Sequence, residues 1–225
     1  MNAEPTEVLL DEAALQIDAN GNLCHLLTLK GLEKSLLVDI LDDAENYLSE
    51  PGDLPARSQS LEGRTVGNLF FEPSTRTRAS FDLAGKRLGA DVLNLDVNTS
   101  SRKKGESILD TIYTLQAMHV DVMVVRDASD GVPAYIARHV EPHVSILNAG
   151  ESDVSHPTQG LLDMLTIRQH KGSFDDLAVA IVGDIRHSRV AMSATHALTT
   201  LGVGELRLIS PSVLAPDEDK APGAR

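Results

Sequence analysis

The amino-acid sequence predicts an α/β fold, in which a parallel-sheet domain is followed by a second, smaller and incomplete α/β unit. Three observations lead to this fold class. Short apolar runs alternate with helical patterns from about residue 65 to residue 209, which is typical of sheets built from strand–helix–strand units. Polar and charged residues gather where the apolar runs end. After about residue 173 only one more strand–helix–strand unit follows.

Helices are expected where apolar residues recur at three- and four-residue spacing. The first such pattern runs from Leu32 to Leu48, and a later one begins with Pro157, a residue suited to the first turn. The pattern predicts helices over residues 32–48, 75–88, 106–118, 132–139, 157–170 and 188–201.

Strands are expected in the short apolar runs between these helices. They are predicted at residues 65–71, 90–95, 120–125, 144–147, 177–182 and 206–209. In open parallel sheets, ligands bind outside the carboxyl ends of the strands. The polar segments of this chain follow predicted strands, so we expect them to form one site; they are residues 74–78, 98–104, 126, 150–156 and 184–189.

The two ends of the chain show neither pattern. Residues 1–22 are acidic and are interpreted as an N-terminal extension, whereas the stretch after residue 209 is rich in proline, alanine and charge. The domains predicted between them are 23–156 (first domain), 157–172 (linking helix) and 173–225 (partial second domain with an aperiodic tail). About 50 residues is small for a stable domain. We therefore expect this unit to pack on the first domain or a partner, or the chain to be truncated.

Composition excludes several classes of function. The 225-residue chain is 42% hydrophobic and carries a net charge of −13, which argues against non-specific nucleic-acid binding. Cys24 is the only cysteine, so no intramolecular disulfide is expected. The start does not resemble a signal peptide, and no apolar run approaches the ~20 residues of a membrane helix. A cytoplasmic protein without a membrane span is expected.

Residues 74–78 read Ser-Thr-Arg-Thr-Arg and stand where a predicted buried strand is followed by the start of a predicted helix. The free backbone N–H groups at a helix start bind anions. Ser74 is suited to the N-cap position, and Arg76 adds a positive charge. The segment therefore predicts a phosphate site. The plainer alternative is a capped helix with exposed arginines.

Two further positively charged positions follow strands. Arg126 at a strand end can bind an oxyanion through two hydrogen bonds, or it can form a surface ion pair with Asp127 or Asp130. The polar loop of residues 98–106 carries three adjacent cations. It is interpreted either as a lid or as a solvated, flexible loop.

His156 and Arg189 complete the candidate set. His156 precedes a proline that fixes the next helix start, which indicates a positioned side chain, although a lone histidine is more often structural. Gly183 and Asp184 suit a tight turn and a helix cap, and this reading is compatible with ligand binding by Arg189. The spacing of histidines and cysteines predicts no metal site.

Taken together, these segments resemble the transcarbamoylases, the family of aspartate and ornithine carbamoyltransferases. The chain contains F-F-E-P-S-T-R-T-R, N-T-S-x-x-x-K-G-E, H-P-T-Q and V-G-D-x-x-x-x-R in the family's order, between about residues 23 and 210. The resemblance implies a carbamoyl-phosphate-binding domain followed by an incomplete Rossmann-like aspartate-binding domain. The second motif is characteristic of the aspartate branch, so ornithine is disfavoured as the acceptor.

The resemblance also implies a reaction and its residues. The carbamoyl group of carbamoyl phosphate would pass to the amine of L-aspartate without a cofactor, a step of pyrimidine synthesis. The residues implied to hold carbamoyl phosphate are Ser74, Thr75, Arg76, Thr77, Arg126, His156 and Gln159, of which Arg76, Thr77, Arg126 and His156 are the catalytic ones. Lys104 and Arg189 would bind aspartate, and Ser100 and Lys104 would be lent to a neighbouring subunit.

The implied assembly is a homotrimer, and the extension before Leu23 resembles members that assemble with dihydroorotase-like chains. The sequence departs from the family at its end. It stops before a second aspartate-binding arginine, a nearby glutamine and a Leu-Pro loop. The alternative function is therefore an inactive, truncated remnant that binds carbamoyl phosphate or only assembles with partners.

Overall fold

The computed structural model describes residues 12–50, 52–95 and 107–217. Its larger sheet contains four parallel strands in the order β2-β1-β3-β4. These are β1 (Thr65–Phe70), β2 (Asp91–Leu95), β3 (Val122–Asp127) and β4 (Ser145–Glu151). The predicted α/β class with a parallel sheet is confirmed.

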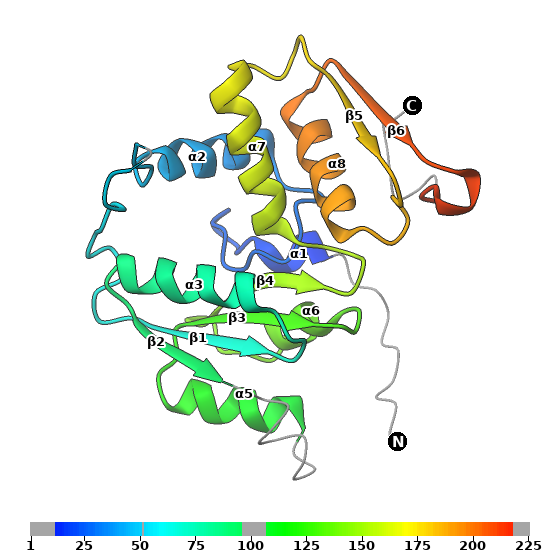
Figure 1. The fold of residues 1–225 in the computed structure, drawn as a ribbon. Coiled ribbons are helices and arrows are strands. Elements are labelled where there is room, and N and C mark those ends of the chain that lie inside the picture. Colours follow the sequence, from blue (N-terminus) through cyan, green and yellow to red (C-terminus); the bar gives the residue numbers. More distant parts are fainter. Residues whose placement is uncertain (1–11, 51, 96–106, 218–225) are drawn as a thin grey trace.

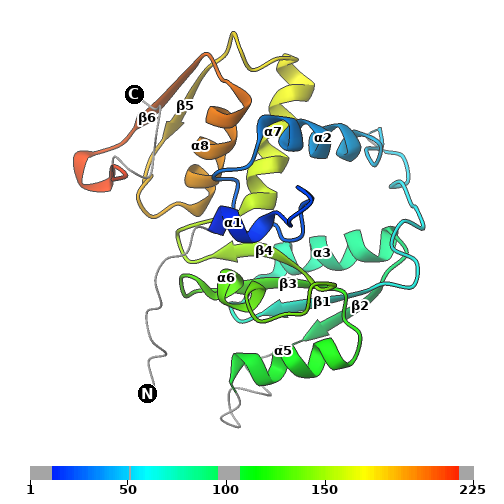
Figure 2. The same ribbon diagram turned by 180° about the vertical axis from the view of Figure 1, so that it is seen from behind.

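Helices cover both faces of this sheet (Figures 1 and 2). Helix α3 (Thr75–Arg87) packs on one face, and α5 (Ile108–Ala117) and α6 (Val132–Ala137) pack on the other. Side chains alternate between the faces as strand geometry requires. Val66 and Val124 face α3, whereas Leu69, Met123 and Val125 face α5 and α6. This alternation also directs Arg126, two residues after Val124, to the α3 face.

The second unit is one strand–helix–strand element, made of β5 (Ala178–Val182), α8 (Arg189–Leu201) and β6 (Glu205–Ile209). Its helix packs against α7 (Pro157–Lys171) and α2 (Lys34–Glu45) (Figure 1). The buried side chains of this second core include Leu37, Leu41, Met164, Leu198 and Leu206. Thus the small unit is stabilised by α2 and by α7, and α7 also contacts β4 of the first sheet.

Two strands extend further than the apolar runs predicted. β3 continues through Arg126 and Asp127, and β4 continues to Glu151. The polar residues at these ends are nevertheless buried, Arg126 at 7% and Glu151 at 1% exposure. The hydrophobic pattern therefore underestimates the length of both strands at their carboxyl ends, where a ligand would bind.

The N-terminal segment also differs from the expected extension without regular structure. Residues Glu12–Gln16 form the short helix α1, which packs near α6. The buried Gln16 side chain accepts hydrogen bonds from the backbone N–H groups of Leu27 (2.6 Å) and Thr28 (2.9 Å). Because a buried amide side chain is polar, the hydrophobic pattern does not predict its burial. The described part of the aperiodic tail likewise contains a short 3₁₀ helix, Ser212–Leu214.

Within the described ranges, no helix combines the length and the apolar character that a membrane crossing requires.

Candidate anion-binding site

A pocket of about 750 Å³ lies at the carboxyl edge of the four-stranded sheet, between the starts of α3, α7 and α8. It is lined by eight of the predicted site residues, namely Ser74, Thr75, Arg76, Thr77, Arg126, His156, Gln159 and Arg189. Ser100 and Lys104 lie outside the described residues. Segments up to 115 residues apart in the sequence therefore contribute to one cavity.

The turn between β1 and α3 offers hydrogen-bond donors that suit an anion. Ser74 occupies the N-cap position of α3 in extended conformation, but its side chain makes no capping hydrogen bond. The hydroxyl is thus not committed to the helix, unlike that of a typical N-cap serine. Thr75, Arg76 and Thr77 form the first turn of α3, where backbone N–H groups lack intrahelical partners. This end of the helix favours a negatively charged ligand.

Arg126 is held rigidly at the end of β3. Its guanidinium donates to the carbonyl oxygen of Ala149 (Nη1–O, 3.2 Å) and to the carboxylate of Glu72 (Nη2–Oε1, 3.1 Å). Only 9% of its side chain is exposed. A buried, oriented guanidinium of this kind suits bidentate recognition of a phosphate or carbonyl oxygen.

Glu72 joins two arginines and was not identified by the sequence analysis. Its other oxygen lies 3.4 Å from Nη1 of Arg189, which also donates to the carbonyl oxygen of Ser152 (2.8 Å). Glu72 lies two residues before Ser74 of the candidate anion-binding turn, and an acidic residue in this position is a sequence signal that could have indicated its role. In this arrangement Glu72 balances two guanidinium charges.

Gly150 permits the two arginines to converge. Its φ of +122° is rarely adopted by residues with a side chain. A Cβ atom at this position would lie 2.8 Å from Nη1 of Arg126 and 3.3 Å from Cζ of Arg189. A glycine is therefore required both by the backbone and by the packing of the guanidiniums.

His156 is buried at the N-cap position of α7, with 8% of the residue exposed. Its backbone N–H donates to Oγ of Ser193 on α8 (2.8 Å), which fixes the helix start. Burial, assisted by the positive charges of Arg189 and Arg126, lowers the pKa of His156 to about 4. The imidazole is therefore neutral at physiological pH. It carries one N–H, which can donate to an oxygen that gains negative charge.

The pocket is positively charged although the chain is acidic. Arg76, Arg126 and Arg189 line it, and Glu72 contacts two of them. Such local focusing of positive charge favours a small polyanion. Across the described residues, no group of three or more histidine, cysteine or acidic side chains is arranged to hold a metal ion.

Glu151, next to Gly150, gives this region a pH-dependent stability. Its carboxylate accepts hydrogen bonds from the backbone N–H of Gly131 and from Asn148 (2.9 Å). Burial, together with the nearby carboxylates of Glu12 and Asp130, raises the pKa of Glu151 from 4.5 to about 7. Between these values the folded protein retains a proton that the unfolded chain releases. The stabilisation is therefore present below pH 4.5 and is lost as the pH rises through 7.

We expect Glu151→Gln to remove this dependence. The free energy of unfolding of the parent, minus that of the variant, should fall by roughly 3 kcal/mol between pH 4.5 and 7.5, since one pKa unit corresponds to ~1.4 kcal/mol. Urea unfolding of both proteins across this range measures it. Taking the difference cancels contributions from other groups, such as the buried histidines. A difference that is constant with pH would contradict the assignment.

Residues 24–169 match the family model for the aspartate/ornithine carbamoyltransferase carbamoyl-P binding domain. The catalytic subunit of M. jannaschii aspartate transcarbamoylase is 36% identical, with a TM-score of 0.77 over 88% of this chain and 64% of that one. Aspartate transcarbamoylase from Trypanosoma cruzi in complex with carbamoyl phosphate is 31% identical, with a TM-score of 0.77 over 95% of this chain and 64% of that one.

A structure named for the other acceptor is also similar. Ornithine carbamoyltransferase from Thermus thermophilus is 28% identical, with a TM-score of 0.78 over 88% of this chain and 66% of that one. Overall similarity therefore does not distinguish the two acceptors. In each of these comparisons the chain spans less than two thirds of the relative's length.

Proposed function

Because the chain belongs to the aspartate/ornithine carbamoyltransferase family, we propose that it binds carbamoyl phosphate in this pocket and transfers the carbamoyl group to L-aspartate. The products are N-carbamoyl-L-aspartate and phosphate. The observation that carries the proposal is the convergence of the α3 N-terminus, three arginines and a neutral histidine on one cavity. Transfer of a carbamoyl group requires such groups, which bind the phosphate and stabilise the charge that develops on the carbonyl oxygen.

The chemistry requires positioning and charge stabilisation. The amine of aspartate attacks the carbamoyl carbon, so that a C–N bond forms and the carbonyl oxygen gains negative charge. Thr77, Arg126 and His156 donate hydrogen bonds to that oxygen. The bond to the phosphate oxygen then breaks, and the proton of the amine leaves with the phosphate. Ser74, Thr75, Arg76, Thr77, Arg126 and the N–H groups of the α3 start hold the leaving phosphate.

Aspartate rather than ornithine is proposed as the acceptor on two grounds. Arg189, the first residue of α8, lines the pocket and can pair with a carboxylate. The motif N-T-S-x-x-x-K-G-E, with Ser100 and Lys104, is the one typical of the aspartate branch. The resemblance likewise supports a cytoplasmic homotrimer in which this loop serves a neighbouring subunit, with a dihydroorotase-like chain as a candidate partner.

A second candidate is binding of carbamoyl phosphate without transfer. The residues proposed for the phosphate all line the pocket, whereas Arg189 is the one lining residue proposed for aspartate. The chain also spans only 64% of the length of two aspartate transcarbamoylases. The two candidate functions therefore share the carbamoyl phosphate site and differ only in whether the chain also binds and carbamoylates aspartate.

Two measurements on the 225-residue chain separate these functions. Calorimetry with carbamoyl phosphate reports binding, and a colorimetric assay reports carbamoyl aspartate when both substrates are saturating. We expect both to be positive, with no product when L-ornithine replaces aspartate. Binding without product would favour the second candidate, and product from ornithine alone would overturn the acceptor. Absence of both binding and product would overturn the proposal.

A further inference from the structure

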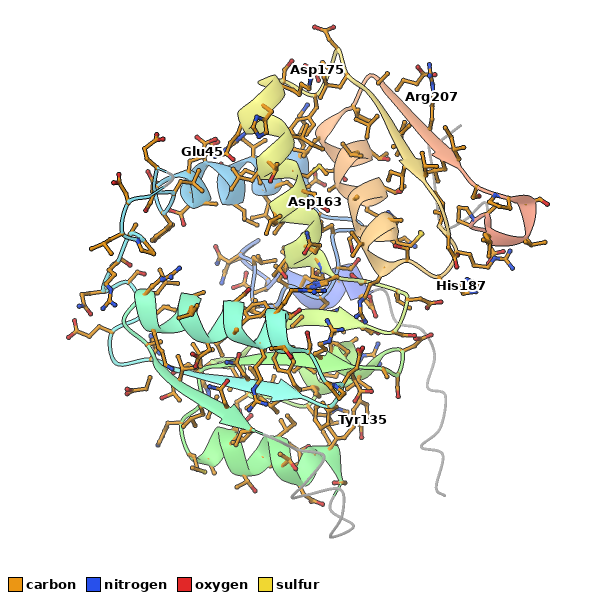
Figure 3. All side chains as sticks on the ribbon, in the orientation of Figure 1. Glu45, Tyr135, Asp163, Asp175, His187 and Arg207 are labelled. Atoms are coloured by element: carbon orange, nitrogen blue, oxygen red, sulfur yellow. The ribbon has the colours of Figure 1, made fainter. Side chains whose placement is uncertain are left out.

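Gln159 lines the pocket from the first turn of α7 and contacts an acidic residue one turn later. Its amide Nε2 donates to Oδ1 of Asp163 at 3.0 Å. Residues four apart are neighbours on a helix surface, so the contact needs no distortion of α7. Asp163 lies on the same helix (Figure 3). It is half-buried and is not among the residues that line the pocket. We therefore expect no direct contact between Asp163 and a ligand in the pocket.

The contact selects one of the two orientations of the Gln159 amide. An amide offers a carbonyl oxygen on one side and an NH₂ group on the other, whereas an ionised carboxylate only accepts hydrogen bonds. With Asp163 as the neighbour, the NH₂ group is held against the carboxylate, and Oε1 is the end of the amide left for the pocket. The reverse orientation would place two acceptor oxygens together.

The protonation state of Asp163 is part of this arrangement. Burial raises the pKa of Asp163, and the hydrogen bond from Gln159 opposes that rise. A protonated Asp163 could donate instead of accept, which would permit the reverse orientation of Gln159. Acidification would then exchange the oxygen for the NH₂ group on the pocket side.

We propose that Asp163 is a positioning residue that acts through Gln159, by fixing Oε1 as an acceptor for the NH₂ group of the carbamoyl ligand. This inference rests on the proposed binding of carbamoyl phosphate. Its consequence is selectivity among acyl phosphates. A carbamoyl group has N–H donors, whereas the methyl group of acetyl phosphate, which has nearly the same shape, has none. Gln159 and Asp163 should therefore increase the affinity for carbamoyl phosphate and leave the affinity for acetyl phosphate unchanged.

The test is a double-mutant cycle read with two ligands. Asp163→Asn, Gln159→Ala and the double variant are titrated with carbamoyl phosphate and with acetyl phosphate. An asparagine can present either an oxygen or an NH₂ group, so Asp163→Asn should weaken carbamoyl phosphate binding about fivefold to tenfold. It should cause no further loss when Gln159 is already alanine. Acetyl phosphate affinity should change less than about twofold throughout.

Two controls accompany the cycle. Asp163→Glu keeps an acceptor-only carboxylate and should recover most of the affinity lost in Asp163→Asn. Asp176→Asn makes the same change of charge at an exposed position beyond α7 and should leave both affinities unchanged. Circular dichroism of each variant establishes that the fold is retained.

The outcomes distinguish this inference from the function on which it rests. Additive losses in the double variant, or equal losses for the two ligands, would overturn the role of Asp163 while carbamoyl phosphate binding stands. An unchanged affinity in Gln159→Ala would overturn the role of Gln159 and therefore that of Asp163. If the parent chain does not bind carbamoyl phosphate, the proposed function fails and the inference fails with it.

Discussion

Replacement of Arg126 with alanine is expected to lower the affinity for carbamoyl phosphate at least about 100-fold. Hydrogen bonds to charged groups contribute ~1.5–3 kcal/mol each, and ~1.4 kcal/mol corresponds to tenfold. In the proposed site the Arg126 guanidinium contacts both the phosphate and the carbonyl oxygen, so its removal would cost the ligand more than one such bond. The substitution also leaves Glu72 without one of its partners, so that its carboxylate repels an incoming dianion. Calorimetric titration with carbamoyl phosphate measures the loss.

Two variants make this result specific. Arg126→Lys keeps the charge but not the planar fork, and should recover only part of the affinity. Arg186→Ala removes an exposed arginine that pairs with Asp217 outside the pocket, and should bind within about twofold of the parent. Parent-like affinity in Arg126→Ala would remove Arg126 from the binding site.

Replacement of His156 with alanine is expected to lower turnover roughly 10²–10³-fold with little change in the affinity for carbamoyl phosphate. Loss of one preorganised donor to a developing oxyanion has an effect of about this size. The hydrogen bond strengthens as the oxygen gains charge, so the loss falls on kcat rather than on binding. Steady-state kinetics of the variant, under the conditions in which the parent forms carbamoyl aspartate, measures it.

The pH profile tests the same residue in another way. Burial and the neighbouring arginines lower the pKa of His156 to about 4, which keeps its imidazole neutral as the pH rises above that value. No titration of this histidine should therefore appear in kcat between about pH 5.5 and 8. The exposed His187, which pairs with Asp184, provides a control, and His187→Ala should keep parent-like turnover. A kinetic pKa near 6.5 that disappears in His156→Ala would contradict the neutral-donor role.

Much of the fold could be predicted because its elements have strong local patterns. The helices at Thr75–Arg87 and Arg189–Leu201 begin at or within a residue of the expected positions. The differences at α1, β3 and β4 have a common cause, which is the burial of polar side chains. α1 depends on the side-chain hydrogen bonds of Gln16, and the ends of β3 and β4 contain buried Arg126 and Glu151. Hydrophobic periodicity cannot register residues whose burial is compensated by hydrogen bonds.

In the candidate site, too, the sequence predicts some features and misses others. Motifs indicated eight residues that line the pocket, because strand ends of a parallel sheet converge. The sequence did not indicate the pairing of Glu72 with Arg189, which are 117 residues apart, or the support of His156 by Ser193. Both contacts cross between the first sheet and the second unit. Such contacts depend on how the units pack, which local patterns do not determine.

Helix α7 begins in the pocket and ends in the second core. Its N-cap is His156 and its first turn carries Gln159. Further along the helix, Met164 packs in the second core and Arg168 pairs with α2. We expect unfolding at one end of this helix to loosen the other end as well. Amide protons of α7 and α8 should therefore exchange with solvent in a single cooperative step. A ligand in the pocket should slow hydrogen exchange in α8 as well as in α3, which extends its protection well beyond the residues that it touches.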